Sequence, residues 1–281
     1  MKLINLKCAK GLVALLVAAL ALPTFAKPLE SKIHREMQKE EMKVKFLVKA
    51  AYDGNYDNVV WYVDHGGVDP NIPDSHGNTA LQVAATRGNL KIVEYLAGKA
   101  ELEYGNKAQR GTALVRAAAA GHGEVVRLLI KRGAEVEAAD SAGRTALMQA
   151  VNLYTMDPDK YKDVIDALVE EGHANVNTPA NDKTTAIILA AEIQSESSLQ
   201  VMNYLWEKGA NVNQQGWLDN TALHVAIQRG DPVSLKKVEF LVGTAKADPT
   251  VKGHMGWTPL QKAKEYGLNE IVDYLNEHEA Q

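Results

Sequence analysis

The sequence is poor in cysteine, since Cys8 is the only one among 281 residues. Disulfides within the chain are therefore excluded, and the fold has to be held by its apolar core. Cys8 follows Leu6 and Lys7 and no small residue, so lipid attachment is not expected. The N-glycosylation acceptor Asn-x-Ser/Thr is also absent, which fits a bacterial envelope better than a eukaryotic secretory lumen.

An apolar run long enough to cross a membrane is missing near the start of the chain. Residues 11–22, GLVALLVAALAL, are 12 in number, whereas a membrane-spanning helix needs about 20. Three lysines precede this run and PTFA, ending in the small Ala26, follows it. This order is typical of a secretory signal peptide. We predict a signal peptide over residues 1–26, a processed chain starting at Lys27, and no stable membrane insertion after cleavage. A retained anchor is the alternative.

Positive charge is scarce in the rest of the chain. Of 31 basic residues, three lie in the predicted signal peptide, which has no acid, so 28 basic residues face 35 acidic ones and leave a net charge of −7. Phosphate binding depends on clustered Lys and Arg. We therefore expect no nucleic acid partner.

Motifs for catalysis and metal binding are missing too. We find no G-x-S-x-G, no H-E-x-x-H and no glycine-rich phosphate loop, so we predict no enzyme and no cofactor. Asp157, Asp159 and Asp163 in MDPDKYKD resemble part of a calcium loop. However, Lys162 stands where that loop needs Gly, and Leu168 stands where it needs Glu. The eight histidines show no ligand spacing either, so we predict no metal site and interpret His122 and His224 as hydrogen-bonded structural histidines.

What the sequence does contain is a repeat, which can be aligned on threonine. Spacings of 33, 33, 40, 36 and 37 separate the threonines, which are Thr79, Thr112, Thr145, Thr185, Thr221 and Thr258. Two residues after each one stands Leu or Ile. Five residues after each one stands alanine: Ala84, Ala117, Ala150, Ala190, Ala226 and Ala263. Glycine follows at the ninth position in four of the six.

Each unit predicts two short helices. The threonine caps the first helix by accepting from free backbone N–H groups, and Leu and Ala point inward. The glycine takes the left-handed turn before the second helix. One helix pair is too small to bury a core, so the units have to stack. The invariant alanine indicates close contact between neighbouring helices.

The pattern resembles the ankyrin repeat, as in GNTALQVAATRGN, NTALHVAIQRGD and GWTPLQKAKEYG. Only Pro259 and His224 keep the proline and the histidine of the family pattern. The resemblance implies an all-α solenoid of about seven stacked repeats, each a helix-turn-helix with a β-hairpin finger. It also implies a protein partner bound by the fingers and the exposed face of the first helices.

The domain organisation follows from these units. We predict an ankyrin-repeat domain over residues 46–281, with capping repeats at 46–74 and 253–281. Residues 27–45 form a charged, solvated helix or arm, for which partner binding is the alternative. Three turns between helices are lengthened and are interpreted as tolerated surface length. They are YTMDPDKY at 154–161, QSESS at 194–198, and QRGDPVSL at 228–235, which keeps the glycine as Gly230 and adds Pro232.

Apolar and aromatic side chains gather near the fingers of the last two units. The candidate protein-binding residues are Trp217, Leu218, His254, Met255, Trp257 and Tyr266. Such residues are typical interface anchors. The alternative is that adjacent fingers pack on each other and hide the rings.

The function expected is a non-enzymatic protein-binding module or scaffold, monomeric and located in the periplasm, because the chain resembles exported bacterial ankyrin-repeat proteins. Two alternatives remain open. One is a secreted, extracellular effector that acts on host proteins, and the other is an accessory protein that stabilises a periplasmic enzyme.

Overall fold

The structure is a computed structural model that describes residues 23–105, 111–228 and 231–278. The predicted signal peptide lies outside the described residues except for its last four. The chain divides into two compact units, residues 1–101 and 102–281, and each is described by itself. None of the helices within the described ranges is both long and apolar enough to span a membrane.

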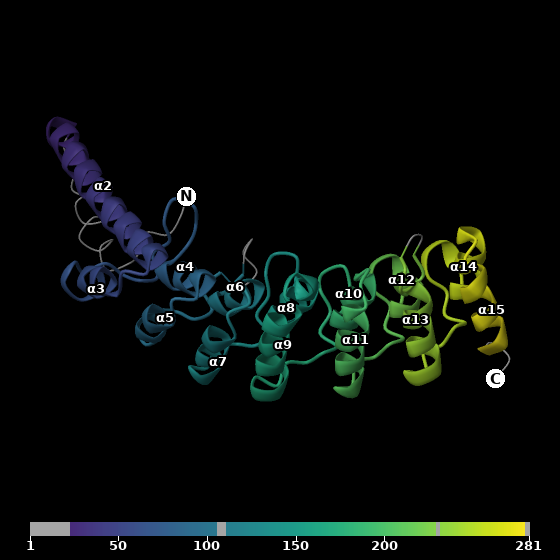
Figure 1. Cartoon of the computed structure of the whole chain (residues 1–281). Helices are drawn as coiled ribbons and strands as arrows, with labels where there is room; N and C mark the ends of the chain where they lie inside the picture. The colour runs from purple at the N-terminus through teal and green to yellow at the C-terminus, as the bar shows by residue number, and fades with distance from the viewer. Residues whose placement is uncertain (1–22, 106–110, 229–230, 279–281) are drawn as a thin grey trace. The chain divides into compact units, whose positions relative to one another are not determined.

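The first unit contains two helix pairs (Figure 1). Its elements are α2 (Pro23–Asp53), α3 (Tyr56–Val60), the π-helical turn η1 (Trp61–His65), α4 (Ala80–Arg87) and α5 (Leu90–Ala97). The last two turns of α2 act as the first helix of a pair, since Leu47, Val48 and Ala51 are buried there and α2 packs on α3 and α4.

The charged segment 27–45 is the beginning of the same helix α2. Its side chains from residue 34 to residue 41 are exposed, and Lys39 and Lys43 pair with Glu36 and Glu40 one turn before them. No break separates this segment from the first repeat, so the domain boundary at residue 46 stays a prediction.

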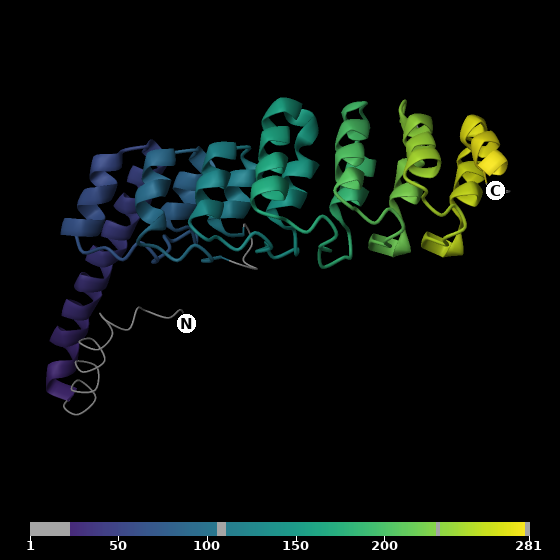
Figure 2. The same ribbon diagram turned by 90° about the horizontal axis from the view of Figure 1, so that it is seen from below.

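The second unit contains five helix pairs within the described residues. In chain order its elements are α6 (Ala113–Ala119), α7 (Gly123–Lys131), α8 (Ala146–Asn152), η2 (Tyr154–Met156), α9 (Pro158–Asp166), η3 (Ala167–Glu171), α10 (Ala186–Glu192), α11 (Ser197–Glu207), η4 (Trp217–Asp219), α12 (Ala222–Ala226), α13 (Ser234–Glu239), η5 (Phe240–Thr244), η6 (His254–Gly256), α14 (Pro259–Tyr266) and α15 (Asn269–His278). The first helices of the pairs form one layer and the second helices another, as Figures 1 and 2 show.

Contact between successive first helices builds the core of the second unit. The packing runs from α6 to α8, α10, α12 and α14 in turn. All six repeat alanines have a relative exposure of 0%. This burial confirms the prediction of close contact at the alanine, where a larger side chain would separate neighbouring helices.

The threonine caps are confirmed at four of the six repeats. The side chains of Thr79, Thr112, Thr145 and Thr258 each accept from the backbone N–H three residues later, at 3.3 to 3.4 Å. The cap is absent at Thr185, whose hydroxyl is buried without a hydrogen bond among the described residues. The left-handed glycine turn is confirmed at Gly88, Gly121 and Gly267, and Gly230 lies outside the described residues.

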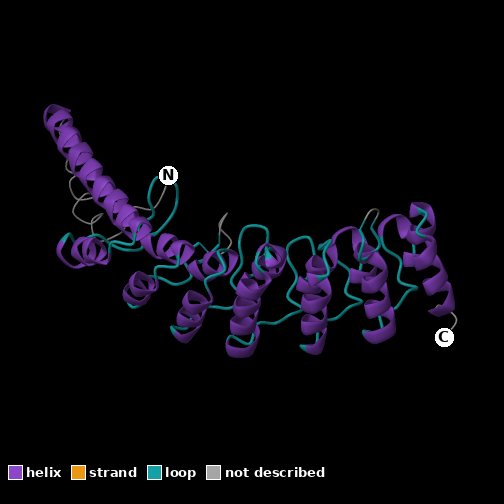
Figure 3. Cartoon of the chain, viewed as in Figure 1, coloured by secondary structure: helices purple, strands orange, loops and turns teal. Residues whose placement is uncertain are grey.

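The β-hairpin fingers that the resemblance implied are not built from strands. Within the described residues the fingers are loops (Figure 3), and the one bridge, Ala139 to Thr145, is isolated. Each of the five fingers that lie wholly within the described residues is closed by a backbone bond from the N–H of its first residue to the C=O of its fifth. The pairs are 74 and 78, 140 and 144, 180 and 184, 216 and 220, and 253 and 257. One such bond is too short a ladder to form strands.

A second row of hydrogen bonds links the segments that connect one repeat to the next. In each, a side-chain oxygen accepts from a backbone N–H about one repeat later, at 2.6 to 2.8 Å. With the accepting side chain named first and the donating backbone N–H second, the pairs are Asn71 and Glu101, Glu103 and Glu135, Glu137 and Asn175, Asn177 and Asn211, and Asn213 and Asp248. The row satisfies backbone groups that no strand satisfies.

A buried ion pair holds the turn between α12 and α13. The Nζ of Lys237 donates to Asp231 at 2.6 Å and to the backbone C=O of Ala191 at 2.9 Å, and both charged side chains have an exposed fraction of 0%. Removing one partner would leave the other charge buried and unpaired. The pair therefore fixes this lengthened turn against α10.

Replacing Ala117 by leucine should overpack α6 against α8. We expect Ala117→Leu to lower the free energy of unfolding by roughly 1–3 kcal/mol, as measured by urea denaturation. Ala142→Leu, the same change at an exposed finger position, is the control and should change stability by less than about 0.5 kcal/mol. Equal stability of the two variants would contradict the packing described above.

Candidate protein-binding surface

Two neighbouring fingers of the second unit, residues 216–220 and 253–257, share one backbone conformation. Each begins with a glycine at φ near −100° and ψ near −140°. The third residue is left-handed in both, Leu218 at φ 56° and Met255 at φ 59°. An L-residue in this region costs about 1–2 kcal/mol. Non-glycine residues held there tend to cluster at functional sites.

The glycines explain why these two fingers differ from the fingers that begin with Asp74 and Asp140. At the fingers that begin with Asp74 and Asp140, the carboxylate accepts from two N–H groups of the same loop and shapes it. Gly216 and Gly253 cannot do this. A Cβ on Gly216 would lie 2.8 Å from a methyl of Ile188. A Cβ on Gly253 would lie 2.6 Å from the Oδ1 of Asn220. The preceding repeat thus requires glycine here.

Side chains join the two fingers to each other. The Nε2 of Gln215 donates to the C=O of Asp219 at 2.8 Å and to the C=O of Lys252 at 2.9 Å. The N–H of His254 donates to the Oδ1 of Asn220 at 3.1 Å. The tips are therefore held together as one surface.

The predicted binding residues divide into three groups. Trp217 and Met255 are 63% and 71% exposed and Leu218 is 38% exposed, while His254 is exposed as well. These four lie at the joined tips and do not hide one another; we call them the finger patch. Trp257 is half-buried at the base of its finger.

Tyr266 lies apart from the finger patch. It is the last residue of α14, whose first turn adjoins the finger, and the ends of an eight-residue helix are about 10 Å apart. Together with Ile227, Gln228 and Lys262 it lines a hollow of about 480 Å³, and the Nζ of Lys262 lies 5.5 Å from the centre of its ring. The alignment of the repeats on threonine did not show that Tyr266 and the finger lie at opposite ends of this helix.

His224 connects the core to the second of these fingers. Its Nδ1 accepts from the backbone N–H of Thr221 at 3.3 Å, as Gln82 and Gln261 do for their threonines. Its Nε2 therefore carries the proton and donates to the C=O of Trp257 at 3.0 Å. Burial lowers the pKa of His224, so the ring is neutral and fully hydrogen-bonded. This confirms its interpretation as a structural histidine.

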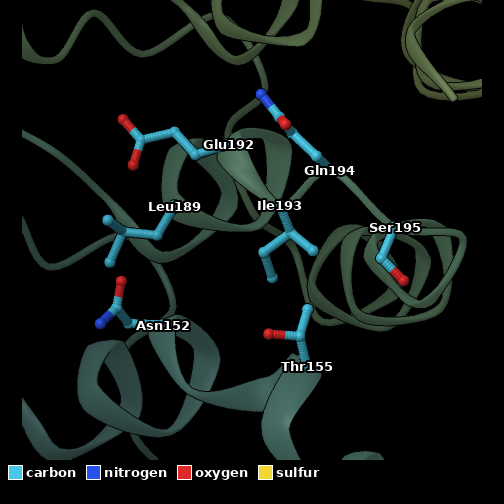
Figure 4. A pocket seen from close by; sticks show the side chains of 7 residues that line it. All are labelled: Asn152, Thr155, Leu189, Glu192, Ile193, Gln194 and Ser195. Atoms are coloured by element: carbon cyan, nitrogen blue, oxygen red, sulfur yellow. The ribbon is translucent and has the colours of Figure 1, made fainter. Parts of the chain in front are cut away.

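A hollow on the first helices was missed by the sequence analysis. About 400 Å³ in volume, it lies between the ends of α8 and α10 and is lined by Asn152, Thr155, Leu189, Glu192, Ile193, Gln194 and Ser195 (Figure 4). The lengthened turns 154–161 and 194–198 form its rim. The two repeats involved both lack the turn glycine, which was the available indication that their helices end differently.

A second exposed aromatic cluster lies in the first unit. The rings of Phe46 and Tyr62 stack with centroids 6.3 Å apart, and Trp61 packs edge-on against Tyr62 at 5.2 Å. Trp61 is 55% exposed. This cluster can be compared with the finger patch, because it also exposes an indole but its backbone has no left-handed non-glycine residue.

Comparison with known proteins identifies the fold family. A family profile described as "Ankyrin repeats (3 copies)" matches residues 15–108, 47–140, 101–178 and 153–253. The chain belongs to the ankyrin-repeat family. Ankyrin repeats are protein-binding modules, and their fold is typically a non-enzymatic scaffold. The solved structure of the ankyrin repeat domain of Bcl-3 resembles this chain with a TM-score of 0.67 and 27% identity, over 82% of this chain and 97% of that one.

Similar curated proteins share the repeats but are much longer. The mouse B-cell lymphoma 3 protein homolog is 28% identical over 215 residues, 74% of this chain and 37% of its own length. The L-asparaginase of Dirofilaria immitis is 26% identical over 228 residues, 81% of this chain and 30% of its own. The E3 ubiquitin-protein ligase Ufd4 of Drosophila melanogaster is 38% identical over 89 residues, 31% of this chain and 3% of its own. Most of each relative lies outside the match.

His224 makes the stability of this ankyrin-repeat protein pH-dependent. Because its folded pKa is lowered below the unfolded value of about 6.5, the unfolded chain binds the proton first. The stabilisation from the neutral ring is complete above that value and is lost as pH falls towards the folded pKa. Melting temperatures between pH 7.5 and 5 should fall less steeply for His224→Gln than for the unchanged chain.

The glutamine in this variant keeps the cap to Thr221 but loses the bond to Trp257, at a cost of about 1 kcal/mol at pH 7.5. His254→Gln, at an exposed ring, is the control and should follow the unchanged chain. Parallel curves for His224→Gln and the unchanged chain would show that the ring does not titrate on unfolding.

Proposed function

We propose that this chain is an exported, monomeric protein-binding module of the cell envelope, which binds its partner through the finger patch. The observation that carries the proposal is the exposure of Trp217 and Met255 at the tips of two hydrogen-bonded fingers. Neither side chain contributes to the core, and the left-handed backbone beneath Met255 is unfavourable for folding. A role in binding accounts for both features.

The finger patch is suited to binding because it is preformed. Side chains held on a rigid loop lose little freedom when a partner docks, which reduces the entropic cost of association. Trp and Met are enriched in the centres of interfaces. Polar groups surround the patch, among them Asn220, Gln215 and Lys252, as in the rim of a specific interface.

Removal of the two exposed anchors should abolish binding without unfolding the protein. We expect Trp217→Ala with Met255→Ala to lower the affinity for the main partner roughly thirtyfold, which corresponds to about 2 kcal/mol. The measurement is affinity capture from envelope extract followed by mass spectrometry, and then titration of the captured partner. The melting temperature should stay within about 2 °C of the unchanged chain, since both side chains lie outside the core.

Trp61→Ala is the matched control, because it removes an indole of comparable exposure from the first unit, 55% against 63% for Trp217. Unchanged capture by this control and lost capture by the double variant support the proposal. Lost capture by Trp61→Ala alone would move the binding surface to the aromatic cluster of the first unit.

The proposed location rests on the first 26 residues. Export through a cleaved signal peptide predicts a processed protein that begins at Lys27, which intact-mass measurement of the purified periplasmic protein would detect. A mass that includes Met1 would contradict export by cleavage. Fractionation distinguishes the periplasm from release into the medium, and the latter result would favour an extracellular effector.

A further inference from the structure

The hollow between α8 and α10 has the chemistry of a binding site of its own. We infer that it receives an arginine side chain of the protein partner, an inference that rests on the proposed function. The hollow lies on the face of the first helices, at the opposite end of these helices from the fingers. The length of α10, about 10 Å for seven residues, separates the hollow from the finger that precedes α10, and the finger patch lies on the next two fingers of the same unit.

The hollow is lined by one carboxylate, Glu192, which has Arg144 within electrostatic range but not in an ion pair. Glu192 forms no ion pair with another described residue, and it is the last residue of α10, where the helix dipole does not favour an anion. Glu192 is exposed at the rim of the hollow, and partial desolvation by the walls raises its pKa, with Arg144 opposing and Asp182 adding to this effect. A cation bound beside it would favour the charged form of the carboxylate.

The neighbouring side chains can accept several hydrogen bonds. Asn152 occupies on α8 the position that Glu192 occupies on α10, seven residues after the repeat threonine, and Thr155 lies beside it on the rim. The Nε2 of Gln194 is bonded to Gln228 at 2.8 Å, which leaves its carbonyl oxygen able to accept. In Figure 4 these side chains surround Leu189 and Ile193.

Arginine matches this arrangement better than the alternatives. A guanidinium group has five N–H donors and no acceptor, and it pairs with a carboxylate through two parallel bonds. Its three-carbon stem can pack on Leu189 and Ile193 while the charged end reaches the polar rim. Lysine offers three donors from one point and would satisfy fewer of the oxygens.

The test needs no partner. Nα-acetyl-arginine methylamide is titrated into the full chain with labelled isoleucine and leucine methyl groups, and the methyl signals of Leu189 and Ile193 are followed by NMR. We expect a saturable shift of both signals with a dissociation constant in the millimolar range. Glu192→Gln should weaken binding at least tenfold. The lysine analogue should bind several-fold more weakly, and the neutral citrulline analogue should give no saturable shift.

Glu196→Gln is the matched control. It removes the same charge four residues away, at a carboxylate that is exposed and already paired with Lys236, and it should change the affinity less than twofold. Absence of a saturable shift, equal weakening by both variants, or equal binding of the citrulline analogue would overturn the inference. None of these results affects the finger patch, whose failure would appear instead as retained capture by the Trp217 and Met255 double variant.

Discussion

Close packing at one alanine per repeat is the constraint on which the second unit depends. Ala117, Ala150 and Ala190 are fully buried where one first helix meets the next. A methyl group at this point allows the helices to approach closely, and a larger group would force them apart. The distance between helices in turn sets the distance between fingers. The bonds from Gln215 to Lys252 and from His224 to Trp257 form only at that distance.

Polar groups between the repeats are satisfied by side chains, because no strands are present to do so in the described residues. Asparagine and glutamate side chains accept from the connecting segments, threonine caps the first helices, and Asp231 pairs with Lys237 at a lengthened turn. The bonds from asparagine and glutamate, and the bond from Lys237 to the C=O of Ala191, tie neighbouring repeats together. A stack of small units needs such nearest-neighbour contacts, since one helix pair alone buries too little apolar surface.

The regular part of this architecture could be predicted from the sequence, because the same positions recur in every repeat. The threonine caps at Thr79 and Thr258, the buried alanines and the left-handed glycines follow from fixed offsets. The same offsets located the four residues of the finger patch, which are Trp217, Leu218, His254 and Met255. Features that occur only once could not be found in this way. The ion pair of Lys237 depends on the turn QRGDPVSL, whose sequence does not recur in another repeat.

The hollow beside Glu192 is another such feature, since it requires two irregular repeats to be adjacent. Tyr266 was grouped with the fingers because it is close to them in sequence. However, it is the last residue of α14 and therefore lies at the end of that helix opposite the finger. The fingers contain no strands in the described residues because each loop has only five residues. The family pattern alone does not distinguish a five-residue loop with one closing bond from a hairpin with two strands.

The left-handed tips of the two fingers have a consequence for how this protein can change. Gly216, Gly253 and the preceding repeat determine the backbone path of the loops, whereas Trp217 and Met255 touch no core. The positions that specify the fold are therefore different from the exposed positions that we propose for binding. New side chains can be introduced at the tips without repacking the solenoid, so the proposed surface can diversify, in evolution or in a designed library, on an unchanged scaffold.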